Sequence, residues 1–78
     1  MSLDMNEARD KVRLTNFGDN LRKIREKLNL SQDEVVANCD VTKGNLSNIE
    51  NGKKDFHFTT LLEIAKGLGV EAKDLLNF

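Results

Sequence analysis

With 78 residues, the chain is long enough for one small domain, and its lack of proline favours helices over a β-sandwich or barrel. Its single cysteine, Cys39, excludes an internal disulfide and a cysteine zinc site, and its apolar runs are too short to span a membrane. The net charge is −1, but residues 16–30 and 42–54 each carry +2, which fits either one positive face or an ordinary mixed surface. The charged start does not resemble a signal peptide, so we expect a cytoplasmic protein.

Two parts are predicted along the chain: an N-terminal extension over residues 1–14 and a main domain over residues 15–78. Apolar residues are loosely spaced in the extension, which fits a weak helix or a mobile tail. A first regular helix is predicted over about residues 16–28. Its inward residues, at helical spacing, are Phe17, Leu21, Ile24 and Leu28.

A second, short helix is predicted to begin at Ser31 and to end near residues 38–40. Ser31 and Glu34 form an S-x-x-E capping box, in which each side chain satisfies a backbone N–H of the other residue. Asp40 is expected to take a left-handed conformation in the following turn. The residues expected to face inward are Val35, Val36 and Cys39.

A third helix is predicted over about residues 42–50, capped by Thr42 and ended by Asn51-Gly52, a pair that tolerates positive φ. Its inward residues are Leu46 and Ile49, with Val41 in the turn before it. The residues left outward are short or polar: Lys43, Gly44, Asn45, Ser47 and Asn48. Two short helices joined by a tight turn can place such a face in the major groove of DNA, where base edges are read.

After a loop over residues 53–57, a fourth helix is predicted over about residues 58–68 and a short fifth helix over residues 71–77. The inward residues of the fourth helix are Leu61, Ile64, Ala65 and Leu68. The chain is therefore expected to be all-α, a compact bundle of five helices. At its end, three apolar residues could belong to the core or form dimer contacts: Leu75, Leu76 and Phe78.

Over about residues 16–77, a series of motifs matches the pattern of one known family in register and without a gap. They are Gly18, Leu21-Arg22-x-x-Arg25, Leu30-Ser31-Gln32, Val41-Thr42, Leu46-Ser47-x-Ile49-Glu50-Asn51-Gly52-Lys53, Leu61-x-x-Ile64-Ala65-x-x-Leu68-Gly69-Val70 and Leu75-Leu76. The pattern resembles the lambda-repressor-like, or Cro/repressor-type (XRE), helix-turn-helix family, whose members are sequence-specific regulators of transcription and usually dimers. The chain departs from that family at Val36, commonly Ala, at Asp40, commonly Gly, and at Phe56, often Pro.

The resemblance also implies roles for individual residues. The helix-turn-helix would be formed by helices two and three, and the implied base readers on helix three are Lys43, Gly44, Asn45 and Asn48. The implied contacts to the DNA backbone are Gln32, Thr42, Ser47, Asn51, Lys53, Lys54, Arg22 and Lys23. Gln32 would in addition support the first residue of helix three. Arg25 and Glu50 would form an internal ion pair between helices one and three.

The expected function is that of a homodimeric regulator on a palindromic site in double-stranded DNA, with no cofactor, metal or small-molecule effector. The alternative is a protein-interaction module, such as an antitoxin or a partner-binding subunit, with the same fold. An enzyme is not expected, because no nucleophile–base pair or glycine-rich phosphate loop is present. His57 is interpreted as a loop or cap residue, and Cys39 as a small core residue rather than a redox sensor.

Overall fold

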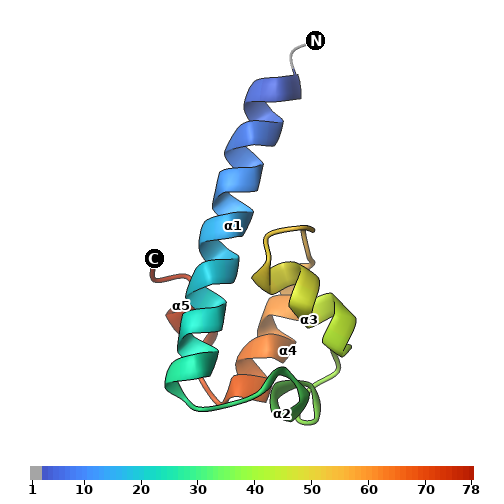
Figure 1. The fold of residues 1–78 in the computed structure, drawn as a ribbon, viewed down its shortest axis with the longest axis vertical. Coiled ribbons are helices and arrows are strands. Elements are labelled where there is room, and N and C mark those ends of the chain that lie inside the picture. Colours follow the sequence, from blue (N-terminus) through green and yellow to red (C-terminus); the bar gives the residue numbers. More distant parts are fainter. Residues whose placement is uncertain (1–2) are drawn as a thin grey trace.

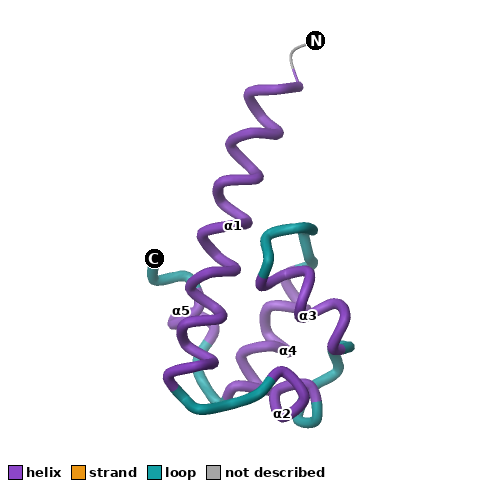
Figure 2. Tube along the Cα trace, in the orientation of Figure 1, coloured by secondary structure: helices purple, strands orange, loops and turns teal. Residues whose placement is uncertain are grey.

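A computed structural model of the chain describes residues 3–78, and the side chains of residues 7–78. In this part of the chain there are five helices and no strand (Figures 1 and 2). They are α1 (Leu3–Lys27), α2 (Gln32–Val36), α3 (Lys43–Glu50), α4 (Phe58–Leu68) and α5 (Ala72–Leu75). The predicted all-α, five-helix architecture is confirmed. None of the described helices combines the length and apolar character that crossing a membrane requires.

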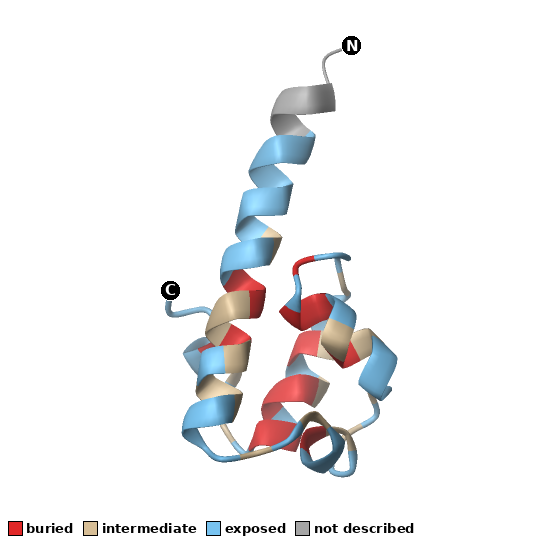
Figure 3. Cartoon of the chain, in the orientation of Figure 1, coloured by how far each residue is buried: buried red, intermediate tan, exposed pale blue. Residues whose placement is uncertain are grey.

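Helix α1 is much longer than the sequence pattern predicted. It continues unbroken through 25 residues, so most of the predicted extension and the predicted first helix are one element. Its N-terminal half projects beyond the bundle (Figure 1), and the side chains of residues 7–13 are all exposed (Figure 3). Local pairs such as Arg13 with Asp10, 3.6 Å apart, support this half of the helix. The prediction for residues 1–2 lies outside the described residues.

Two predictions about the turns are wrong. Leu28 is 43% exposed rather than inward, because α1 ends one residue earlier and the chain reverses at Asn29, which has a φ of 58°. Asp40 is not left-handed, since Asn29 is the one described non-glycine residue with positive φ. The backbone N–H of Asp40 instead donates to Glu63 Oε1 at 2.8 Å, which ties the turn after α2 to α4.

One hydrophobic core receives residues from all five helices (Figure 3). Its buried members are Phe17, Leu21, Val35, Leu46, Ile49, Leu61, Ile64, Ala65, Leu68 and Leu75. The predicted inward faces of α3 and α4 are therefore confirmed. Leu75 is fully buried within the chain, so a dimer contact by Leu75 is ruled out by its packing. Cys39 packs against this core, and burial raises the pKa of its thiol, as expected of a structural cysteine.

The direction of α3 is fixed by a close approach to α1 at Gly18. A Cβ atom at this position would lie 2.5 Å from the carbonyl oxygen of Ile49 and would also collide with the carbonyl group of Glu50. Both of these residues are in the last turn of α3. Only glycine therefore lets the two helices pack at this distance, and this packing positions α3 on the bundle.

Candidate nucleic-acid interface

Helices α2 and α3 form the helix-turn-helix, and a hydroxyl side chain caps the start of each. The Ser31 hydroxyl accepts a hydrogen bond from the N–H of Glu34 at 3.0 Å, and the Glu34 carboxylate accepts one from the N–H of Ser31 at 2.8 Å. The predicted capping box is thus confirmed. The Thr42 hydroxyl accepts a hydrogen bond from the N–H of Asn45 at 3.1 Å. Because these caps fix the first residue of each helix, they fix which α3 side chains face outward.

A buried ionic network anchors the other end of α3. The Glu50 side chain is 2% exposed and accepts hydrogen bonds from Arg25 Nε at 2.6 Å and Nη2 at 3.0 Å. Hydrogen bonding to Glu50 raises the pKa of Arg25, whose Nη1 also donates to the Leu30 carbonyl at 2.9 Å. The ion pair that the resemblance implied is therefore present. Gln32 Nε2 donates to Glu50 Oε1 at 3.1 Å, so Gln32 supports the end of α3 rather than its first residue.

The exposed face of α3 carries three of the four predicted base readers: Lys43, Gly44 and Asn48. A Cβ atom at Gly44 would meet no atom within 4 Å, so the backbone there is open to a close partner. Ser47 is partly buried beside them. Lys43 Nζ lies 3.2 Å from Asp33 Oδ2 of α2, and the two side chains are 57% and 72% exposed.

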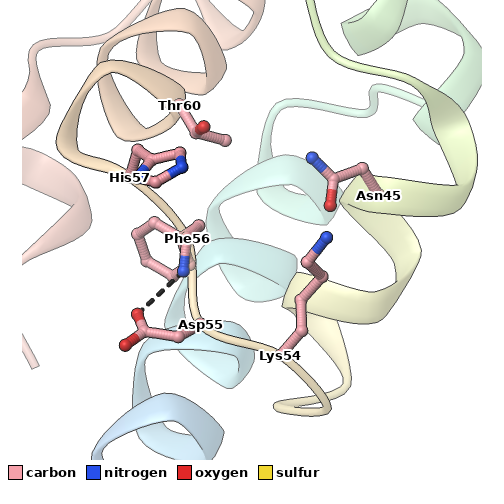
Figure 4. Close-up of a pocket in the computed structure, with 6 residues that line it drawn as sticks. All are labelled: Asn45, Lys54, Asp55, Phe56, His57 and Thr60. Atoms are coloured by element: carbon pink, nitrogen blue, oxygen red, sulfur yellow. Dashed lines mark hydrogen bonds between the residues drawn. The ribbon is translucent and has the colours of Figure 1, made fainter.

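Asn45 does not have its predicted outward position. Its side chain points from α3 towards Lys54 and the segment that leads into α4, where it lines a pocket of about 270 Å³ (Figure 4). The other lining residues are Asp55, Phe56, His57 and Thr60. Asn45 Oδ1 is buried and has no hydrogen-bond partner among the described residues. In this orientation the Asn45 side chain points into the pocket beside α3 and is partly buried.

The predicted backbone contacts divide into two groups. Thr42 precedes α3, and three further polar residues follow it, all of them exposed: Asn51, Lys53 and Lys54. Lys23 instead lines a hollow with Phe78 at the C-terminus, and no residue of α3 lines this hollow. Arg22 is in an ion pair with Asp19 at 2.8 Å. The residues that flank α3 are thus accessible at both ends of the helix, whereas Lys23 lies beside Phe78.

Four large apolar side chains are exposed on α4 and on the C-terminal segment, two parts of the chain that pack together. They are Phe58, Leu62, Leu76 and Phe78. The sequence analysis missed Phe58 and Leu62, although their spacing of four residues on one helix face could have indicated them. His57 is the N-cap residue of α4, in agreement with its interpretation as a loop or cap residue.

Comparison with known proteins gives a consistent match. A family model described as a helix-turn-helix domain matches residues 18–77. Control protein C.BamHI of Bacillus amyloliquefaciens is 40% identical over 63 residues, which cover 80% of this chain and 78% of that protein. Control protein C.MunI of Mycoplasma sp is 39% identical over 62 residues, which cover 78% of this chain and 84% of that protein.

A solved structure agrees with the fold as well. The crystal structure of the restriction-modification controller protein C.AhdI from Aeromonas hydrophila has a TM-score of 0.78 and 25% sequence identity, covering 82% of this chain and 97% of that one. The relatives named here are regulators rather than enzymes. The family match includes the whole helix-turn-helix and leaves out the projecting part of α1. The chain belongs to the XRE-type helix-turn-helix family and is a DNA-binding transcriptional regulator.

Proposed function

We propose that this chain is the control protein of a restriction–modification system, which binds a palindromic operator as a homodimer with α3 in the major groove. The structural neighbour C.AhdI is a restriction-modification controller protein, and the relatives C.BamHI and C.MunI are control proteins; these names support the proposed class of regulator. A regulator of this kind acts on DNA in the cytoplasm, so we expect the protein to be cytoplasmic.

The observation that carries the proposal is the exposed face of α3, on which Lys43, Gly44 and Asn48 lie. Lys43 is the first residue of this helix, and its ammonium group can donate to O6 and N7 of guanine. The amide of Asn48, one turn further on, has the donor and acceptor that match adenine N6 and N7. Gly44 lies between them with open space in front of its Cα, so the backbone can approach the base edges closely.

Contacts to phosphates would hold α3 in register in the groove. Thr42 lies before the helix, and Asn51, Lys53 and Lys54 follow it, so both ends of α3 offer polar groups to the DNA backbone. Ser47 is placed to add a contact from the middle of the helix. Gln32 and Arg25 contribute indirectly, because both bind the buried carboxylate of Glu50.

The exposed apolar side chains of α4 and the C-terminal segment, Phe58, Leu62, Leu76 and Phe78, would form the contact between two copies. To read two half-sites, the two-fold axis of this contact would have to place the two α3 helices about one turn of DNA apart, roughly 34 Å. The same residues favour the second candidate function, a protein-interaction module in which they bind a different protein.

Selection from a pool of random duplex DNA, at two salt concentrations, tests the proposal. The proposal requires enrichment of a palindromic site whose affinity falls steeply as salt rises. Lys43→Ala should weaken binding to that site, whereas Lys27→Ala, which removes an equal charge from the exposed end of α1, should not. A protein that enriches no site contradicts the proposal. If Lys43 is dispensable and Leu76 is required for partner binding, the interaction module is the better description.

A further inference from the structure

The proposed reader Lys43 is already bound by another side chain in the structure. Its ammonium nitrogen lies 3.2 Å from Asp33 Oδ2, and this ion pair joins the first residue of α3 to the second residue of α2. The neighbouring carboxylate in that turn, that of Glu34, accepts a hydrogen bond from the N–H of Ser31. The Asp33 side chain makes no cap hydrogen bond and lies outside the core, although its charge favours the first turn of α2. An exposed acid beside a DNA-binding helix repels phosphates.

The stereochemistry of the pair leaves Lys43 able to read a base. An ammonium group has three N–H donors, and Asp33 accepts one of them. Two donors remain, and the major-groove edge of guanine offers two acceptors, O6 and N7. A lysine already held in one orientation also loses less side-chain freedom when it binds, which favours the complex.

Phosphates present a different situation. A phosphate on the DNA backbone can also accept from the two remaining donors of Lys43, but it carries a full negative charge and is repelled by the Asp33 carboxylate, which offsets much of the attraction to the ammonium. The Asp33 pair therefore disfavours those complexes in which α3 has not entered the groove at its correct site. The pair is therefore expected to raise the affinity for operator DNA and to lower the affinity for unrelated DNA.

We propose that Asp33 is a specificity-determining positioning residue, which directs two donors of Lys43 towards a guanine and withholds this lysine from phosphates. The inference rests on the proposed function, in which α3 reads an operator. It assigns to α2 a role in sequence discrimination, in addition to its role as support for α3.

Asp33→Asn in the full chain tests this inference, with affinities measured over a salt series for the selected operator and for an unrelated duplex of equal length. We expect operator affinity to fall by about threefold and unrelated affinity to rise by about threefold, as expected for one exposed ion pair. The specificity ratio then falls by about tenfold. For the unrelated duplex, the slope of log affinity against log salt concentration should steepen by the amount expected for about one phosphate contact, because Lys43 is released from Asp33.

Three variants separate this effect from a general change of charge. Asp40→Asn is the matched control, because it makes the same substitution at an exposed position of the same helix-turn-helix. Asp33→Glu, which keeps a carboxylate, should retain most of the specificity ratio. In a Lys43→Ala background, Asp33→Asn should leave the ratio unchanged. The urea unfolding midpoint of Asp33→Asn should fall only slightly, because both members of the pair are largely exposed and the substitution removes one of two acids from the first turn of α2.

Several results would overturn the inference. One is an equal change for Asp33→Asn and Asp40→Asn, and another is an unchanged specificity ratio. A new preferred base would mean that Asp33 itself reads a base, for instance the amino group of cytosine, and is not a positioning residue. If the wild-type protein shows no preference for any operator, the proposed function fails and this inference fails with it. If the preference exists and Asp33→Asn leaves it intact, only this inference fails.

Discussion

Two glycines in helices should respond in opposite ways to replacement by alanine. Gly44 is in the first turn of α3, where an added Cβ would meet no atom within 4 Å. Gly18 is in α1, where the same Cβ would lie 2.5 Å from the Ile49 carbonyl oxygen. Neither glycine has a positive φ, so the local backbone accepts alanine at both positions. The two substitutions therefore differ only in what the methyl group meets.

The size of each effect follows from these surroundings. Alanine is favoured over glycine within a helix by about 0.5–1 kcal/mol. Because residue 44 is in the first turn, Gly44→Ala should raise the free energy of unfolding by about 0.5 kcal/mol, the lower end of this range. Overpacking costs about 1–3 kcal/mol, and its upper end applies to Gly18 because the overlapped atoms are main-chain atoms of α3. After the gain in helix propensity, Gly18→Ala should destabilise the fold by about 2 kcal/mol.

Urea unfolding followed by far-ultraviolet circular dichroism measures both effects, since the chain has no tryptophan or tyrosine to serve as a fluorescent probe. A Gly18→Ala variant as stable as the wild type would refute the close packing of α1 on α3. A destabilised Gly44→Ala variant would show that the start of α3 is covered. Although stabilised, Gly44→Ala should bind the operator more weakly, because its methyl group occupies the space in front of the helix.

Four further predictions concern the core, the reader, the caps and the dimer. Glu50→Ala should lower the free energy of unfolding by about 3–5 kcal/mol in the same urea assay, because it leaves a largely buried guanidinium unpaired; a wild-type value would contradict the network. Lys43→Ala should weaken operator binding by about 1–3 kcal/mol and relax the preference at one base pair in a repeated selection; an unchanged preference argues against α3 as the reader. The hydrogen bond from the Ser31 N–H lowers the pKa of Glu34 from 4.5, so the stability that the capping box adds is present above pH 4.5 and is lost as the pH falls through the lowered value. The loss of stability in Glu34→Ala, measured by urea unfolding, should therefore shrink in acid, and a loss that does not depend on pH would exclude this linkage. Phe78→Asp should shift the protein to monomers in sedimentation equilibrium, and a wild-type assembly state would place the interface elsewhere.

The helices of the main domain could be predicted from local signals. The capping box at Ser31, the cap at Thr42 and the positive φ at Gly52 depend on residues next to them in sequence, and the structure has all three. The extent of α1 could not be predicted, because residues 7–13 are exposed and the sequence before residue 16 shows no periodic pattern. The turn at Asn29 was missed for a different reason. How α1 and α2 pack decides at which residue the chain reverses.

The candidate site shows the same division. Helical spacing placed Lys43 and Asn48 correctly on the exposed face of α3. It also placed Asn45 there, but the segment before α4 returns beside α3 and covers the Asn45 oxygen, which no local pattern reveals. The pairing of Lys43 with Asp33 likewise joins two helices, so it could be found only in three dimensions.

The most direct test of the central claim, that α3 reads the major groove through Lys43, uses the selected operator with single guanines replaced by 7-deazaguanine. This base lacks the N7 acceptor in the major groove and is unaltered in the minor groove. We predict that replacement at one symmetry-related pair of guanines weakens binding of the wild-type protein and has no further effect on Lys43→Ala. Equal binding to all the replaced operators, or an equal loss for both proteins, would contradict the placement of Lys43 in the groove.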